Sequence, residues 1–277
     1  MNNSVEAERA PAVETFELVR RFGDFVAVDG VNLRVGRGQF FGFLGPNGAG
    51  KSTTIKMLTG LLEPTAGSVR VLGRDVAGES LEVKRRIGVV PEDLNLFERL
   101  TGAEMLTFTG RMYGLGREET TKRARELLEL MELDGEPRKL VVEYSHGMKK
   151  KLSLACALIH RPEILFLDEP FEGVDALASR TLKDLLLKLT ARGITVFLTS
   201  HVLEIVERLC THIAIITGGR LVVEGALDEL RRGIAVGEQG GTDVDGSSSS
   251  PMSLEDYFIR VIGGARTAGE DVLPWLA

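Results

Sequence analysis

A glycine-rich segment, residues 45–53, has the residue types and spacing needed to hold a phosphate group. It fits the pattern Gly-x-x-x-x-Gly-Lys-Ser/Thr, in which glycines let consecutive backbone N–H groups approach a phosphate closely. Lys51 can reach the β- and γ-phosphates of a nucleotide, and the hydroxyl of Ser52 can ligate Mg²⁺. The candidate nucleotide-binding residues are therefore Gly45, Pro46, Asn47, Gly48, Ala49, Gly50, Lys51, Ser52 and Thr53.

The residues on both sides of this segment fit the same interpretation. The apolar run Phe40–Leu44 precedes it, and a helical pattern containing Ile55 and Leu58 follows it. The order strand, loop, helix is the context that the motif requires, and the positive N-terminal end of the helix favours an anion. A glycine-rich turn that matches by chance is the alternative, and the flanking pattern disfavours it.

Two carboxylates end a second apolar run. Asp168 and Glu169 come directly after Ile164–Leu167. Asp168 can hold the shell of a Mg²⁺ ion, and Glu169 is then placed to orient or deprotonate a water, a role that contributes roughly 10²- to 10⁴-fold in rate. The alternative is that the two acids only cap the next helix, and the phosphate loop upstream disfavours it.

A third apolar run, Thr195–Leu198, is followed by a histidine, His201. Ligands bind at the carboxyl ends of the strands of an open α/β sheet, so His201 can hydrogen-bond a γ-phosphate there. A purely structural histidine is the alternative at this position.

The pattern of elements predicts a sheet that brings these residues together. Residues 31–35 alternate between apolar and polar, as in a half-exposed strand. Apolar runs of four or five residues alternate with helical patterns, which predicts a mainly parallel sheet covered on both faces. The runs are Phe40–Leu44, Ile164–Leu167, Thr195–Leu198 and Ile213–Ile216, and the helical patterns are Thr181–Leu189 and Val202–Leu209.

A helical insertion of about residues 96–159 interrupts this alternation. It lacks strand-like runs and contains three helical patterns: Ala103–Met112, Glu118–Met131 and Met148–Ile159. We expect a flexible N-terminus at 1–11, one domain at 12–232, a Gly/Ser-rich linker at 233–252 and a tail at 253–277 with a short helix at 253–261.

Composition bounds the class of protein. A formal net charge of -6 over 277 residues argues against a dedicated nucleic-acid binder. The sequence contains no run of 18 apolar residues and no apolar signal core, so we expect a cytoplasmic protein whose membrane role would need another chain. Cys156 and Cys210 lack metal-ligand spacing and are expected to be reduced thiols.

The order of these motifs resembles the ABC ATPase family from about Phe16 to Leu230. The residues that carry the resemblance are the phosphate loop, the segment Tyr144–Met148, Asp168-Glu169-Pro170, Asp175 and His201. The resemblance implies an α/β P-loop NTPase with a mainly parallel central sheet, an N-terminal antiparallel β part and a helical insertion. It also implies ATP and Mg²⁺ as ligands.

The resemblance assigns further roles residue by residue. Phe22 resembles the aromatic residue that stacks on adenine, and Asp175 resembles an aspartate at the seam of a dimer. Glu92 stands where a glutamine is usual, with a carboxylate that can reach Mg²⁺; a solvent-facing Glu92 is the alternative. His201 resembles the switch histidine. The segment that resembles the signature motif, which binds the γ-phosphate held by a second subunit, is Ser145, His146, Gly147 and Met148.

Local physics supports the signature assignment. Ser145 and Gly147 precede a helix, where a cap and free amide groups are expected. Three lysines, 149–151, then place positive charge at the unfavourable end of the helix dipole. Either an anionic partner lies nearby or the lysines are solvated. His146 and Met148 depart from the usual signature. With them, the segment resembles the variant typical of ABC exporter ATPases that pair with type-2 membrane subunits.

The resemblance implies one subunit of an ABC exporter that acts through ATP-dependent dimerisation. The expected partners are a second ATPase subunit, as a homodimer, and a separate multi-span membrane subunit; no nucleic acid is expected. The protein would lie on the cytoplasmic face of the membrane. Residues 94–100 could receive a helix of the membrane partner or could belong to the core. The alternative function is a soluble ABC ATPase that acts on ribosomes or DNA.

Overall fold

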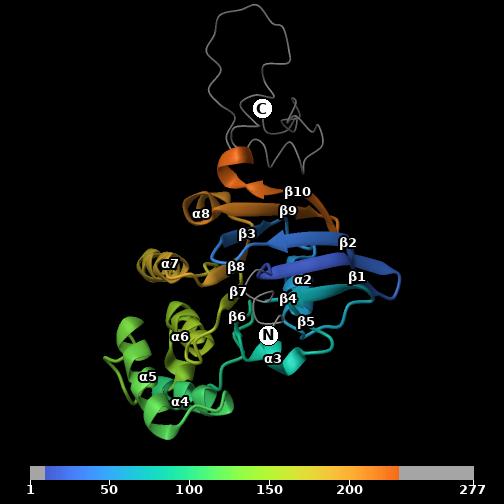
Figure 1. Ribbon diagram of the computed structural model, residues 1–277. Helices are drawn as coiled ribbons and strands as arrows, with labels where there is room; N and C mark the ends of the chain where they lie inside the picture. The colour runs from blue at the N-terminus through green and yellow to red at the C-terminus, as the bar shows by residue number, and fades with distance from the viewer. Residues whose placement is uncertain (1–9, 231–277) are drawn as a thin grey trace, which may run out of the picture. The chain divides into compact units, whose positions relative to one another are not determined.

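The computed structural model describes residues 10–230, and its centre is a six-stranded sheet (Figure 1). The strand order is β10-β9-β3-β8-β7-β6, and β3 pairs in parallel with β8 and β9, as β7 does with β6 and β8. The strands are β3 (Phe40–Leu44), β6 (Ile87–Val90), β7 (Ile164–Asp168), β8 (Thr195–Ser200), β9 (His212–Thr217) and β10 (Arg220–Ala226).

Apolar side chains cover both faces of this sheet. Every residue of β3, β7 and β8 is buried, as expected for parallel strands enclosed on two sides. The ring of Phe197 lies at the centre, with its centroid 5.4 Å from that of Phe41, 5.5 Å from that of Phe43 and 5.6 Å from that of Phe166. This aromatic cluster fixes the three strands whose ends carry the candidate site.

A second, antiparallel sheet has the strand order β2-β1-β4-β5. Its strands are β1 (Val13–Phe22), β2 (Phe25–Val35), β4 (Ala66–Val71) and β5 (Arg74–Asp75). Gly23, with a φ of 57°, and Asp24 form the two-residue turn between β1 and β2. Phe22 and Phe25 are therefore cross-strand partners at the end of the hairpin.

Helices lie on both sides of the central sheet (Figure 1). Helix α2 (Lys51–Leu58) contacts β2 and β4 of the antiparallel sheet and β7 of the central sheet, so it is packed between the two sheets. Helices α7 (Ala176–Ala191) and α8 (Leu203–Leu209) cover the other side, where both contact β8. The short helix α3 (Ser80–Lys84) contacts β6.

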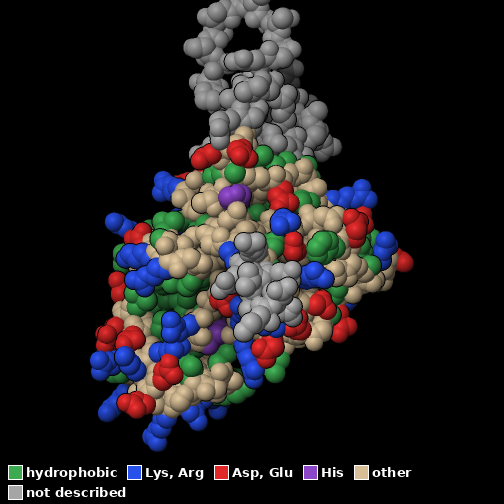
Figure 2. All heavy atoms as spheres, in the orientation of Figure 1, with side chains coloured by type: hydrophobic (Ala, Val, Ile, Leu, Met, Phe, Trp, Pro, Cys, Tyr) green, Lys and Arg blue, Asp and Glu red, His purple; other side chains and the backbone are tan. Residues whose placement is uncertain are grey.

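The helical insertion contains α4 (Gly102–Met112), α5 (Arg117–Leu130), the 3-10 turn η1 (Val141–Glu143) and α6 (His146–Leu158). Thr101 begins α4 with a capping box, in which its hydroxyl and the Glu104 carboxylate bond each other's backbone N–H groups. Helix α6 contacts both β6 and α7, so it joins the insertion to the central sheet. The exposed surface of α5 carries i,i+4 ion pairs, and Figure 2 shows acidic and basic side chains interspersed at that end of the molecule.

The expected fold class is confirmed, with differences at the level of single elements. The apolar runs that predict strands coincide with β3, β7, β8 and β9, and the three helical patterns coincide with α4, α5 and α6. β2 begins at Phe25 rather than at Val31. The alternation of apolar and polar residues predicted only the second half of the strand, because the first half alternates less regularly. β6 was not predicted from its short apolar run, and its parallel pairing with β7 extends the sheet.

The boundaries predicted for the domain, the linker and the C-terminal tail remain expectations. Residues up to Glu224 form one compact unit, and residues from Gly225 on belong to another. The linker at 233–252 and the tail at 253–277, with its short helix, lie outside the described residues. Within residues 10–230, no helix is both long enough and apolar enough to cross a bilayer.

Candidate functional site

The phosphate loop connects the end of β3 to the start of α2, and two of its glycines are required by close contacts. A Cβ atom at Gly45 would lie 2.3 Å from the carbonyl oxygen of Ile216, and one at Gly50 would lie 2.5 Å from that of Ala27. Gly50 also has a φ of 107°, in the region that favours glycine. Gly50 is the N-cap of α2 but offers no side chain, and the first turn contains no acidic residue. The N–H groups there are left for a ligand.

A cleft of about 310 Å³ opens over this loop. It is lined by loop residues 47–53 and by Phe25, Ala27, Glu92, Glu169, Glu172 and His201. Glu92, Glu169 and His201 were predicted for the site, whereas Phe25, Ala27 and Glu172 were not. The carboxyl ends of β3, β7 and β8 thus meet at one edge of the sheet, as parallel strands should.

Lys51 and Glu169 form a buried ion pair at the floor of the cleft. Their residues are only 6% and 7% exposed, and Nζ of Lys51 lies 3.3 Å from Oε1 of Glu169. Nζ also donates to the carbonyl oxygens of Gly45, at 2.8 Å, and Pro46, at 3.3 Å. Oε1 of Glu169 accepts no hydrogen bond from the described residues and keeps free lone pairs. This oxygen is also buried from solvent, and the Lys51 ammonium is its one polar contact among the described residues.

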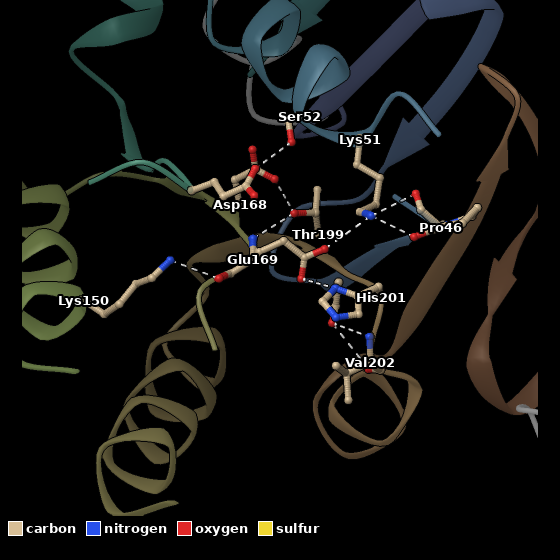
Figure 3. A network of polar contacts seen from close by, with 12 residues as sticks. Pro46, Lys51, Ser52, Lys150, Asp168, Glu169, Thr199, His201 and Val202 are labelled. Carbon is tan, nitrogen blue, oxygen red and sulfur yellow. Dashed lines mark hydrogen bonds and ion pairs between the residues drawn. The ribbon is translucent and has the colours of Figure 1, made fainter. Parts of the chain in front are cut away.

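The other oxygen of Glu169 faces His201, whose Nδ1 lies 3.1 Å from Oε2. In Figure 3, dashed lines join one oxygen of the Glu169 carboxylate to Lys51 and the other to His201. The His201 side chain is 41% exposed, so it can also meet a ligand in the cleft. The structure therefore brings together the loop lysine, the candidate base and the candidate switch histidine.

Asp168 is joined to its neighbour Glu169 by hydrogen bonds to one threonine. The hydroxyl of Thr199 donates to Oδ1 of Asp168 at 2.6 Å and accepts from the backbone N–H of Glu169 at 3.0 Å. Asp168 is 3% exposed and does not line the cleft, whereas Ser52 does. Sequence analysis did not select Thr199, although it directly precedes Ser200 and His201.

The oxygen atoms near Ser52 fit a Mg²⁺ site. The Ser52 hydroxyl donates to Oε2 of Glu92 at 3.4 Å, so Glu92 is turned toward the phosphate loop, although its side chain is largely exposed. Within residues 10–230 no group of three or more His, Cys, Asp or Glu residues is arranged as a metal cluster. Mg²⁺ usually takes one or two protein ligands together with substrate phosphates and water, and a hydroxyl with nearby carboxylates suits that chemistry.

The signature-like segment lies apart from the cleft. Ser145 caps α6 by accepting from the Met148 N–H at 3.3 Å, as expected, and both Ser145 and His146 are exposed. Asp175 caps α7 by accepting from the Ala178 N–H at 2.9 Å. Ser145, His146, Gly147, Met148 and Asp175 do not line this chain's own cleft.

Signature and seam residues nevertheless lie close to each other. A ring nitrogen of His146, Nε2, is 3.1 Å from the carbonyl oxygen of Glu172. A Cβ at Gly147 would lie 3.3 Å from Oδ2 of Asp175, so the backbone packs tightly there. The structure therefore places these residues on one surface, separate from the phosphate loop.

The three consecutive lysines of α6 each have an acceptor in the same chain. Nζ of Lys149 donates to Glu98 and Nζ of Lys151 to Glu132, while Nζ of Lys150 donates to the carbonyl oxygen of Glu169 at 3.1 Å. Lys150 and Lys151 are buried, so the interpretation of three solvated lysines is wrong for these two.

The candidate base-stacking residue, Phe22, is 47% exposed and does not line the cleft. The guanidinium of Arg20 lies over its ring, 4.6 Å from the centroid. Its cross-strand partner Phe25 does line the cleft and is 63% exposed. Of the two rings, Phe25 lines the cleft, whereas the predicted Phe22 is its neighbour across the hairpin.

Residues 28–172 match the model of a known family, described as ABC transporter. This segment contains the phosphate loop, the signature-like segment and the Asp168-Glu169 pair. The chain belongs to the ABC transporter family. Its described domain is an α/β P-loop ATPase domain that binds ATP, in agreement with the architecture and the cleft.

Curated ABC proteins resemble the chain over most of its length. It is 42% identical over 226 residues to the daunorubicin resistance ATP-binding protein DrrA3 of Streptomyces coeruleorubidus, covering 82% of this chain and 70% of that protein. It is 41% identical over 261 residues to the Nod factor export ATP-binding protein I of Burkholderia lata, covering 93% of this chain and 84% of that protein.

Solved ABC structures share the fold. An ATP-binding subunit of an ABC transporter superimposes with a TM-score of 0.79 at 31% identity, over 90% of this chain and 99% of that one. A dimeric, post-hydrolysis state of the ATP-binding cassette MJ0796 with ADP and Pi gives a TM-score of 0.72 at 27% identity, over 78% of this chain and 98% of that one.

The two phenylalanines at the hairpin end can be separated by mutation. We expect Phe22→Ala to weaken ATP binding by about 1–3 kcal/mol, because Arg20 covers one face of the ring while a base can stack on the other. Phe25→Ala is measured beside it, because Phe25 lines the cleft, and Lys51→Ala should nearly abolish binding. Titration with a fluorescent nucleotide measures all three. A larger loss from Phe25→Ala would transfer the stacking role to Phe25.

Proposed function

We propose that this ABC ATPase is the nucleotide-hydrolysing subunit of an exporter and works as a homodimer with a separate multi-span membrane subunit. The observation that carries the proposal is the carboxylate of Glu169, held between Lys51 and His201 at the floor of a phosphate cleft. Through that membrane subunit the protein would lie on the cytoplasmic face of the membrane.

The buried ion pair suggests how ATP prepares its own hydrolysis. The Lys51 ammonium forms an ion pair with the Glu169 carboxylate. The β- and γ-phosphates would compete for that ammonium, and Oε1 of Glu169 would then be released to accept a proton from the attacking water. His201 would retain Oε2 or bond the γ-phosphate, since its ring lies beside Oε2 and also lines the cleft.

Ser52, Glu92 and Asp168 are the residues proposed to hold Mg²⁺. The ion would offset the charge of the phosphates and of the neighbouring carboxylates. Thr199 would fix the Asp168 carboxylate through its 2.6 Å hydrogen bond, so that one oxygen is committed to the protein and the other is left for the metal shell.

Dimerisation is proposed because the signature-like segment does not line this chain's own cleft. Ser145 and His146 are exposed on the surface that also carries Asp175, away from the loop that binds phosphate. In a two-fold dimer each such surface can close the cleft of the other chain. The MJ0796 cassette, which shares this fold, is dimeric in its structure with ADP and Pi, and this supports the arrangement.

Export is proposed from the relatives, one of which is named for Nod factor export and another for daunorubicin resistance. The surface offered to a membrane subunit is the start of the helical insertion. Phe97 and Phe108 are 53% and 44% exposed, and their rings meet edge to face with centroids 5.2 Å apart. In the same segment as Phe97, three leucines are half-buried: Leu94, Leu96 and Leu100. Residues 94–100 could receive a helix of the membrane partner or belong to the core, and the exposed ring of Phe97 favours the first interpretation.

Glu169→Gln tests the base and the dimer together. The amide keeps the shape of the side chain but cannot accept the proton of water, so ATP should stay bound and dimers should accumulate. Light scattering with and without Mg-ATP measures the mass. Lys51→Ala, which should not bind ATP, is the monomeric control. A Glu169→Gln protein that remains monomeric with ATP bound would contradict the dimer proposal.

Purification of the tagged full-length chain from its native membranes tests the partner. We expect a multi-span membrane protein to co-purify, and Phe97→Ser to reduce its recovery because the exchange removes an exposed aromatic anchor. Leu130→Ser, at another exposed apolar residue of the insertion, is the matched control and should leave recovery unchanged. Recovery of ribosomes or DNA instead would support the soluble alternative.

Glu92→Gln tests the metal site. The exchange removes one of three nearby carboxylates, so mutual repulsion without metal should fall and the ATPase rate should depend less steeply on free Mg²⁺. ATPase rates are measured over a range of free Mg²⁺ for the wild type and for Glu92→Gln. Glu98→Gln serves as control, because Glu98 pairs with Lys149 and does not line the cleft. Superimposable curves for wild type and Glu92→Gln would exclude Glu92 from the metal site.

A further inference from the structure

Lys150 is a buried cation in the ATPase domain that the proposed hydrolysis mechanism does not use. The residue is 2% exposed, and it lies on α6, four positions after the helix begins at His146. Its Nζ atom donates to the backbone carbonyl oxygen of Glu169 at 3.1 Å (Figure 3). A lysine is seldom fully buried, and a specific acceptor is needed to compensate the loss of water.

Its acceptor belongs to a residue with an unusual backbone. Glu169 has a φ of 45°, in the left-handed region that residues with a Cβ seldom adopt. Hydrogen bonds hold this conformation on both sides: the N–H donates to the hydroxyl of Thr199 at 3.0 Å, and the carbonyl accepts from Lys150. Such strain persists only where surrounding groups fix it.

The conformation matters because it aims the side chain. With this backbone, the carboxylate of Glu169 lies between Nζ of Lys51, 3.3 Å away, and Nδ1 of His201, 3.1 Å away. A change in φ would turn the Cα–Cβ bond and carry the carboxylate out of this position. The bond from Lys150 therefore bears on the placement of the candidate base, although Lys150 does not line the cleft.

The pKa of Lys150 lies below its ordinary value, because burial outweighs the carboxylates near it. Burial lowers the pKa of Lys150, while the carboxylates of Glu172, Glu92, Asp168 and Glu169 act to raise it. The buried amino group is therefore within electrostatic reach of four carboxylates. An ammonium donor is a stronger partner for a carbonyl than a neutral one.

We propose that Lys150 is a positioning residue for ATP hydrolysis, whose ammonium holds the Glu169 backbone so that the carboxylate faces the attacking water. Since Lys150 lies on the helix that begins with the signature-like segment, the placement of the base also depends on how α6 packs against the end of β7. This inference rests on the role proposed above for Glu169.

Lys151 provides a matched control. It is the next residue of the same helix, it is similarly buried at 7% exposure, and it also bonds an acceptor in this chain. That acceptor is Oε2 of Glu132, at 2.8 Å, in the helical insertion. Removal of either ammonium deletes a buried charge from α6, but only Lys150 contacts Glu169.

The test compares Lys150→Met, Lys150→Arg and Lys151→Met in the full-length chain, with steady-state ATPase kinetics and thermal unfolding of each. Lys150→Met should lower kcat by roughly 10- to 100-fold, the scale of a small misplacement of a reacting group, and change KM for ATP by less than about two-fold. Lys150→Arg keeps charged donors and should recover part of kcat. Lys151→Met should retain the wild-type kcat.

Equal kcat values for Lys150→Met and Lys151→Met would overturn the proposal, and so would a loss that appears only in KM. If Lys150→Met does not fold, Lys150→Ala replaces it, because the smaller side chain leaves room for water at the vacated site. The role of Glu169 is checked separately: a Glu169→Gln protein with the wild-type rate would refute the proposed function itself, whatever Lys150→Met does.

Discussion

The site depends on a carboxylate, that of Glu169, which is buried in the protein. A buried carboxylate is costly unless cations and hydrogen-bond donors compensate it, and four groups from three elements, α2, α6 and β8 with the residue after it, contact Glu169. Lys51 comes from the start of α2, His201 from the end of β8, Thr199 from β8 itself and Lys150 from α6. The remaining architecture can be understood as the means of bringing these groups to one edge of a parallel sheet.

The aromatic core serves the same constraint. Phe197 sits on β8, between the strands that end in the phosphate loop and in Asp168, and its ring contacts a phenylalanine of each. Because the three strands are parallel and in register, their carboxyl ends are held together. Catalytic groups mounted on such strands are placed more accurately than groups mounted on loops.

Much of this site could be predicted from the sequence because its signals are local. The phosphate loop, the Asp168-Glu169 pair and His201 each follow an apolar run, and the rule for parallel sheets then places them at one edge. Thr199 and Lys150 could not be found in this way. Lys150 and its acceptor are 19 positions apart in the sequence, and no periodic signal marks the contact.

The burial of Lys150 and Lys151 could not be predicted from the sequence either. Three consecutive lysines on a helix are ordinarily solvated, and the burial of Lys150 and Lys151 depends on how α6 packs against β6 and α7. Phe25 was missed for a related reason, since only the pairing of β1 with β2 shows that it stands beside Phe22. Contacts between distant elements decide such cases, and no single segment encodes them.

The uncapped start of α2 has a consequence for the lifetime of the protein. Gly50 leaves the first N–H groups of that helix without a side-chain acceptor, and the helix lies between the two sheets. A nucleotide that satisfies those groups binds only the folded chain, so its concentration adds directly to the free energy of unfolding, by about 2.7 kcal/mol at one hundred times the dissociation constant. The cellular ATP pool is thereby a stabilising solute for this domain as well as its fuel, and starvation for ATP would expose it to proteolysis.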